Sequence, residues 1–307
     1  MRATRMTAAA LAACLALAAL GAAAAEARTD NRSKPIVFVH GLDAFGEAGV
    51  NCASTWNTMS GRLGQFGHSG AKATIAYYGG DTNCTHNLGL HGSHSTHHPR
   101  TDAHNSTGGR HDMDGDIRHL GYHLAWTIYN TWSRNGVTVD AVGHSMGGLI
   151  LRYMIHRIQA NDSAFPPYLY VEDVVTLGTP HLGSGWASGC TWAYECVQME
   201  NGSSFINYLN SYAKNPQADG GTDWSLVSSY DDGIVSEGSG TGDSAAKHKV
   251  QYLGSMNIGH SDYMGDTTDT RDADVRYQDL PDTNWYSWYS GPHVVRWSDF
   301  ALTYGSW

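Results

Sequence analysis

Residues 137–150, VTVDAVGHSMGGLI, decide the fold of this chain. The apolar run from Val137 to Val142 predicts a short buried strand, and Met146 to Ile158 predicts a helix. Between them, Gly143–Gly147 matches G-x-S-x-G. In a chain with 36 glycines this match alone is weak. A strand that turns directly into a helix at the serine is, however, the setting that a nucleophile elbow requires. We therefore predict that Ser145 is a nucleophile on a strained turn.

On both sides of this stretch, apolar runs alternate with helical patterns. We expect helices from about Asp116, where Asp114 or Asp116 can cap the start, and over Val294–Leu302. The other expected strands are Ile36–Val39, Ala73–Tyr78, Val171–Leu177, Trp224–Ser228 and Lys249–Leu253. This alternation predicts an α/β fold with a mainly parallel central sheet flanked by helices. We see no repeat and no linker, so we expect residues 28–307 to form a single catalytic domain. Within it, 79–115 is a His-rich insertion loop and 270–307 an aromatic C-terminal extension.

A serine hydroxyl is a poor nucleophile without a base and a site for the developing oxyanion. Two backbone N–H donors are expected in this setting. The first belongs to Met146, which follows the nucleophile. The second is expected on Leu42, because the strand Ile36–Val39 runs straight into His40-Gly41-Leu42.

The remaining catalytic groups are expected in the chain order serine, acid, histidine. The best acid lies at the end of the strand Trp224–Ser228, where we favour Asp232 and keep Asp231 as the alternative. For the base we favour His260, which follows the strand Lys249–Leu253 through a short loop. His293 remains open, since sequence distance does not exclude it.

Four segments together resemble the α/β-hydrolase superfamily, and more narrowly the small lidless bacterial lipases and esterases. They are PIVFVHGL (35–42), VGHSMGG (142–148), LGTPHLG (177–183) and DGIV (232–235). The resemblance spans about residues 35–262 and implies the α/β-hydrolase fold. It also implies a Ser145-Asp232-His260 triad, with Leu42 and Met146 as oxyanion donors. The expected substrate is an ester or lipid, with transient contact to a lipid–water interface. Because the insertion and the extension depart from the small lipases, a polyester depolymerase or an acyltransferase with the same triad remains an alternative.

The N-terminus has the features of a signal peptide, which we assign to residues 1–27. Two early arginines precede an Ala/Leu-rich run, and Ala25-Glu26-Ala27 supplies a small-x-small cleavage pattern. A membrane anchor is disfavoured because the run is only weakly apolar, and no second segment could span a bilayer. We therefore expect a secreted, extracellular protein with no transmembrane segment in its mature form. The net charge of −10 disfavours nucleic acid as a partner.

Four cysteines remain after removal of the signal, an even number that favours disulfides in an exported chain. Three pairings exist, of which we favour Cys52 with Cys84 and Cys190 with Cys196. Their spacings match no common structural zinc site.

Two further features suggest other roles. Nine histidines lie between His86 and His123, with acidic residues nearby, and His119 is one helical turn from His123. A metal site is the alternative to a solvated loop there, but we assign no metal ligands and expect no cofactor. Trp285, Tyr286, Trp288, Tyr289 and Trp297 form an aromatic cluster that either packs over a core edge or grips a substrate. From a different class, a metal- or polymer-binding exoprotein with a vestigial site is the remaining alternative.

Overall fold

The computed structural model describes residues 31–42, 49–88, 115–242, 246, 248–277 and 284–304. The expected signal peptide, and residues 89–114 of the His-rich segment with the metal site considered there, lie outside them. Among the helices of the described ranges, none combines the length and apolar character that crossing a bilayer requires.

The described strands form one nine-stranded sheet in the order β3-β2-β1-β4-β5-β6-β7-β8-β9. They are β1 (Ile36–Val39), β2 (Lys72–Ala76), β3 (His86–Asn87), β4 (Val139–His144), β5 (Val171–Leu177), β6 (Asp223–Ser229), β7 (His248–Tyr252), β8 (Arg271–Tyr277) and β9 (Tyr286–Gly291). From β3 to β7 all neighbours pair in parallel, whereas β8 and β9 pair antiparallel. The predicted α/β fold with a mainly parallel sheet is confirmed.

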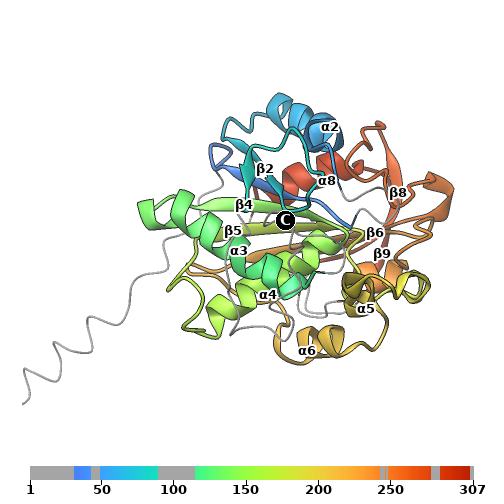
Figure 1. The fold of residues 1–307 in the computed structure, drawn as a ribbon. Coiled ribbons are helices and arrows are strands. Elements are labelled where there is room, and N and C mark those ends of the chain that lie inside the picture. The colour runs from blue at the N-terminus through green and yellow to red at the C-terminus, as the bar shows by residue number, and fades with distance from the viewer. Residues whose placement is uncertain are drawn as a thin grey trace, which may run out of the picture.

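Helices cover both faces of the sheet (Figure 1). They are α2 (Cys52–Gln65), α3 (Ile117–Thr131), α4 (Met146–Gln159), α5 (Tyr194–Met199), α6 (Ser204–Tyr212), α7 (Glu237–Gly240) and α8 (Val294–Ala301), with short 3₁₀ turns η1 (Ser133–Asn135), η2 (Trp186–Cys190) and η3 (Gly254–Met256). Alternate residues of β1 point to opposite faces, as strand geometry requires. Val37 and Val39 join the core under α3 and α4, while Ile36 and Phe38 join the core under α2 and α8.

The helix boundaries follow from local side-chain chemistry. Asp116 caps α3 by accepting a hydrogen bond from the Arg118 amide, which satisfies one of the free amides of the first turn. Asn51 caps α2 in the same way. Buried Cys52, Trp56, Met59 and Leu63 recur at helical spacing and anchor α2 on the sheet.

The C-terminal segment after residue 270 contributes strands and a helix to the fold itself. Arg271–Tyr277 and Tyr286–Gly291 form the two antiparallel strands β8 and β9, and α8 packs on the core through fully buried Trp297. Trp297 therefore cannot grip a substrate, whereas Tyr289 is 73% exposed. The segment after β2 also contributes to the fold, because β3 adds an edge strand and Leu88 is buried.

Parallel strands bring their carboxyl ends to one edge of the sheet, where α/β folds place their ligands. The segment after β1 carries Leu42, and the segment after β4 carries Ser145. The segments after β6 and β7 carry Asp232 and His260. These four positions, far apart in sequence, therefore share one edge.

Candidate active site

Ser145 lies on the tight turn between β4 and α4. Its φ of 54° and ψ of −127° are values that non-glycine residues adopt only under strain. The Ser145 amide donates to the Leu177 carbonyl at 2.8 Å, and the Gly148 amide donates to the Ser145 carbonyl at 3.1 Å. A Cβ on Gly147 would lie 2.2 Å from the Val39 carbonyl oxygen. This residue must therefore be glycine for α4 to start so close to β1.

His260 connects the serine to a carboxylate. Its Nε2 lies 2.9 Å from Ser145 Oγ, and its Nδ1 lies 2.9 Å and 3.1 Å from the two carboxylate oxygens of Asp232. When Nδ1 carries the ring proton it donates to the carboxylate, which leaves Nε2 to accept from the serine hydroxyl. The structure thus brings together the three side chains that the sequence singled out.

Asp232 is buried, and four donors surround it. Oδ1 accepts from the amides of Ile234 and Val235 at 2.9 Å each, and Oδ2 accepts from Tyr263 Oη at 2.9 Å. Burial alone would raise the pKa of Asp232. The hydrogen bond and charge of His260, together with the two amides, instead lower that pKa below its ordinary value. The carboxylate is therefore ionised at neutral pH.

The two alternative residues lie elsewhere. Asp231 is exposed to solvent beside the buried Asp232. His293 caps α8, where its Nδ1 accepts from the Arg296 amide at 3.1 Å. The structure therefore places His260, rather than His293, in contact with Ser145, and Asp232, rather than Asp231, in contact with His260.

Both expected oxyanion donors flank the serine. A Cβ on Gly41 would lie 2.6 Å from Ser145 Cβ, so the segment that ends in Leu42 passes directly over the serine. Met146 is the first residue of α4. Its amide belongs to the first turn, whose N–H groups point out of the helix and carry its positive dipole end.

A cavity of about 320 Å³ opens at these groups. Its lining consists of Leu42, His144, Ser145, Pro180, Ser184, Trp186, Ala187, Met199, Ile234, Val235, His260 and Ser261. Most of these side chains are apolar, and among the polar ones His260 contacts Ser145 Oγ, a combination that is usual for a small-molecule site. The cavity can hold an apolar group attached to a carbonyl at the serine.

Two disulfides brace the segments around the site. Cys52 pairs with Cys84, and Cys190 pairs with Cys196. The second joins the last residue of η2 to the first turn of α5. Leu42 and Trp186 pack against the small cluster formed by Cys190, Ala193 and Cys196. This disulfide therefore supports one wall of the cavity.

Two residues of the site were not foreseen from the sequence. His144 Nε2 lies 2.7 Å from the His260 carbonyl oxygen, and Tyr263 donates to Asp232. His144 is the variable residue of G-x-S-x-G, so its place beside the nucleophile was a usable signal. For Tyr263 the only signal was its place three residues after His260.

The helical histidine pair is buried on α3. The rings of His119 and His123 lie 4.5 Å apart. In the part of the chain that the structure describes, no group of three or more His, Cys, Asp or Glu side chains is arranged to hold a metal ion.

One family model matches this chain, over residues 84–212, and its description is "Putative serine esterase (DUF676)". The matched segment contains Ser145 and ends before Asp232 and His260. A comparison with curated proteins found no match.

Solved structures with a similar fold include several lipases. The mature Bacillus licheniformis lipase BlEst2 is 19% identical, with 69% of this chain and 81% of that chain covered and a TM-score of 0.42. The lin2722 product of Listeria innocua is 17% identical, with 76% and 89% covered and a TM-score of 0.46. Aspergillus fumigatus lipase B is 14% identical, with a TM-score of 0.45; 76% of this chain is covered, but only 49% of the lipase. The sheet order and the strand–elbow–helix turn at Ser145 define this chain as an α/β-hydrolase by fold.

Proposed function

We propose that this protein is a secreted serine carboxylic-ester hydrolase of the lipase and esterase type. The observation that carries the proposal is the continuous hydrogen-bonded series from Asp232 through His260 to Ser145 Oγ, with 2.9 Å at its final contact. A serine on a strained elbow, a histidine base and a buried carboxylate that orients it are the parts that acyl transfer needs. The match of residues 84–212 to an esterase family supports the same reading.

In the proposed mechanism, His260 Nε2 takes the proton of Ser145 Oγ as the oxygen attacks the ester carbonyl. The amides of Leu42 and Met146 stabilise the oxyanion, and Asp232 stabilises the imidazolium that forms. The tetrahedral intermediate then collapses, and His260 gives the proton to the departing alcohol. Water attacks the acyl-enzyme with His260 again as base, which releases the acid and regenerates the serine.

The proposed substrate is an acyl ester with an apolar acyl or alcohol group. The cavity supports this choice, because Leu42, Ala187, Met199, Ile234 and Val235 line it beside Ser145. Ile234 and Val235 also supply the amides that hold Asp232. The same short segment therefore both orients the acid and contacts the substrate.

Secretion is part of the proposal and rests on two features. The N-terminal 27 residues have the pattern of a signal peptide, and both disulfides would be unusual in a reducing cytosol. Detection of the protein in culture supernatant, with an N-terminus at residue 28, tests this part. Retention of residues 1–27 on a cell-associated protein would contradict it.

A polyester depolymerase or an acyltransferase would use the same three residues. Turnover of p-nitrophenyl esters of increasing chain length, emulsified triglyceride and polyester film separates these activities. We expect soluble esters to be cleaved, with free acid as product. Transfer of the acyl group to an added alcohol in preference to water would indicate an acyltransferase.

Two matched substitutions test the roles of the acid and the serine. Asp232→Asn should lower kcat about 10⁴-fold, and Ser145→Ala should lower it about 10⁶-fold. Asp231→Asn, which changes the exposed neighbour, should leave kcat within about twofold of wild type. Full activity of Ser145→Ala, or equal effects of the two aspartate variants, would refute the proposal.

A further inference from the structure

His40, the residue before the segment that covers Ser145, makes two buried contacts with acceptors. It is 1% exposed. Its Nδ1 lies 2.8 Å from the Gly41 carbonyl oxygen, and its Nε2 lies 3.1 Å from Asp81 Oδ2. A carbonyl and a carboxylate only accept hydrogen bonds. In each contact, the His40 ring nitrogen can therefore act only as the donor.

The contact between His40 Nδ1 and the Gly41 carbonyl oxygen orients the whole peptide group between Gly41 and Leu42. That carbonyl and the Leu42 N–H belong to the same peptide group, which is planar and trans, so the two point in opposite directions. Holding the carbonyl on His40 Nδ1 thus sets the direction of the Leu42 N–H. Tyr77 Oη, which donates to the His40 carbonyl at 2.6 Å and lies 3.2 Å from the Gly41 carbonyl, restrains the same segment.

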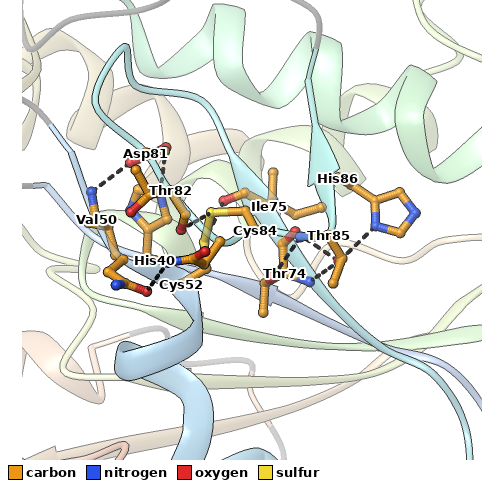
Figure 2. The surroundings of a disulfide bond; sticks show 12 residues. His40, Val50, Cys52, Thr74, Ile75, Asp81, Thr82, Cys84, Thr85 and His86 are labelled. Carbon is orange, nitrogen blue, oxygen red and sulfur yellow. Dashed lines mark hydrogen bonds and ion pairs between the residues drawn. A yellow bond between two sulfur atoms is a disulfide. The ribbon is translucent and has the colours of Figure 1, made fainter.

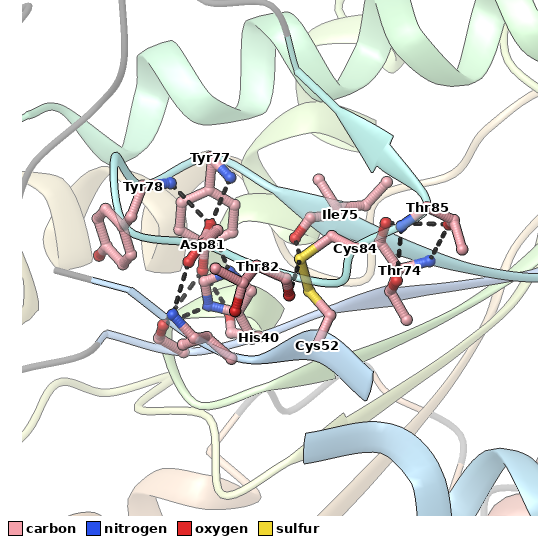
Figure 3. Close-up of polar contacts among 12 residues, drawn as sticks. His40, Cys52, Thr74, Ile75, Tyr77, Tyr78, Asp81, Thr82, Cys84 and Thr85 are labelled. Carbon is pink, nitrogen blue, oxygen red and sulfur yellow. Dashed lines mark hydrogen bonds and ion pairs between the residues drawn. A yellow bond between two sulfur atoms is a disulfide. The ribbon is translucent and has the colours of Figure 1, made fainter. Parts of the chain in front are cut away.

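Asp81 is held rigidly behind His40 (Figure 3). Its Oδ2 accepts from the amides of Tyr77 and Tyr78 at 2.7 and 2.8 Å, and its Oδ1 accepts from the Val50 amide at 2.8 Å. Burial would raise the pKa of Asp81, but the hydrogen bond and charge of His40, with these amides, lower that pKa below its ordinary value. The Tyr77 ring stacks on His40 with centroids 4.0 Å apart, which further restrains the imidazole ring.

The Cys52–Cys84 disulfide lies beside the turn that carries Asp81 and restrains it (Figure 2). The Thr82 amide donates to the Val50 carbonyl, and the Cys52 amide donates to the Thr82 carbonyl, each at 3.0 Å. The Cys52–Cys84 bond joins the same two segments. The position of Asp81 is therefore fixed by the start of α2.

The other side of the segment is held by the second disulfide loop. The Leu42 side chain packs on the cluster that contains Cys190 and Cys196. Tyr78 Oη donates to the buried Glu195 carboxylate of the same loop at 2.5 Å. His40-Gly41-Leu42 therefore lies between the segment closed by Cys52–Cys84 and the loop closed by Cys190–Cys196. The hydrogen bond from Tyr78 to Glu195 links these two segments.

We propose that Asp81 is a positioning residue for catalysis: acting through His40, it orients the Gly41–Leu42 peptide so that the Leu42 N–H meets the oxyanion. This inference rests on the proposed esterase function and adds to it a group that does not touch the substrate. Since the oxyanion exists only in the transition states and tetrahedral intermediates, loss of Asp81 should lower kcat and leave KM nearly unchanged.

The chain contains a matched control for a merely structural role. On α8, buried Asp299 accepts from buried His68 Nε2 at 3.0 Å, nearly the geometry of the Asp81–His40 pair. Both aspartates are fully buried, and both have a pKa lowered by a histidine partner against the raising effect of burial. Asp299 contacts Arg32 and Arg296 rather than the active site.

The test compares Asp81→Asn with Asp299→Asn on a soluble p-nitrophenyl ester, with active sites counted by a fluorophosphonate. We expect D81N to lower kcat about 10- to 100-fold with KM within threefold of wild type. D299N should lower the urea midpoint and leave kcat per active site within twofold of wild type. In the double variant Asp81→Asn/His40→Gln, kcat should be no lower than in His40→Gln alone, because Asp81 acts through His40.

Unchanged kcat in D81N, or multiplicative effects in the double variant, would overturn the inference. If D81N does not fold, H40Q decides: a kcat loss at constant KM supports the inference, and an unchanged kcat overturns it. A wild-type protein that neither cleaves esters nor reacts with the fluorophosphonate would instead refute the proposed function.

Discussion

His144 Nε2 lies 2.7 Å from the backbone carbonyl oxygen of His260, so the residue before the nucleophile holds the main chain of the base. Burial, reinforced by the neighbouring His260 ring, lowers the pKa of His144 to about 3. The His144 ring is therefore neutral at working pH and donates through Nε2–H. The contact fixes the distance between the elbow and the loop after β7.

A substitution pair at position 144 tests this restraint. His144→Leu removes the donor and should lower kcat about tenfold or more, because a small displacement of the base is costly. His144→Gln keeps an N–H donor and should retain more of the activity. Steady-state kinetics on a soluble ester measure both, and equal kcat values for the Leu variant and wild type would contradict the restraint.

Buried histidines should dominate the dependence of the free energy of unfolding on pH under acidic conditions. Burial lowers the pKa of His156 to about 4, with nearby Arg157 adding to the effect, and lowers the pKa of His181 well below its ordinary value. The unfolded chain then binds more protons than the native state between about pH 4 and 6.5. The free energy of unfolding should therefore rise with pH across this window and level off above it.

Urea unfolding at pH 5.0, 6.0 and 7.0 measures that slope. His156→Gln should lower the slope near pH 5 by up to one proton, or at most ~1.4 kcal/mol per pH unit. His156 is still 8% exposed, so the full value is an upper bound. A slope that the substitution does not change would show that His156 does not contribute.

The two disulfides should differ in their effect on stability. Cys52 and Cys84 are 32 residues apart, and Cys190 and Cys196 are six apart. In the loop-entropy model, paired Cys→Ser changes should lower the free energy of unfolding by roughly 3–4 kcal/mol and roughly 2 kcal/mol, respectively. Urea titrations of both double variants give the comparison. A larger loss from the six-residue loop would contradict the entropic account.

The cavity wall should set the acyl-chain preference. Ala187 is buried and lines the cavity, so Ala187→Leu fills space that a longer acyl chain would occupy. We expect kcat/KM for p-nitrophenyl laurate to fall about tenfold or more, an effect within reach of a hydrophobic side-chain change. Turnover of p-nitrophenyl acetate serves as the internal control and should change less than about threefold. Parallel losses on both esters would show general damage to the site.

The strands beside the elbow were predictable because each is a short apolar run closed by glycine or polar residues. Apart from Asp140 in β4 and Glu172 and Asp173 in β5, the first five residues of β4 and all of β5 are mostly apolar, as is common for parallel strands covered on both faces. The antiparallel strands β8 and β9 were missed, since β8 carries charged Asp272 and Asp274 and gains its pairing from β7. The α2 helix was also missed, although Cys52, Trp56, Met59 and Leu63 show its period.

For the site, chain order could nominate Asp232 and His260 but could not show that Asp232 contacts His260 and that His260 contacts Ser145. Asp231 and His293 stayed open as second choices, and the paths of the chain after β6 and β7 separate them from Asp232 and His260. The Asp81–His40 pair was invisible in the sequence for the same reason. Nothing in either segment indicates that residues 41 positions apart meet in a buried contact.

Covalent labelling of Ser145 tests the central claim most directly. The folded wild-type protein is treated with a fluorophosphonate, and the modified peptide is identified by mass spectrometry, with Ser145→Ala as the control. We predict one label per chain, located on Ser145, and no label on Ser145→Ala. An unlabelled wild-type protein, or a label that persists elsewhere in Ser145→Ala, would contradict the account.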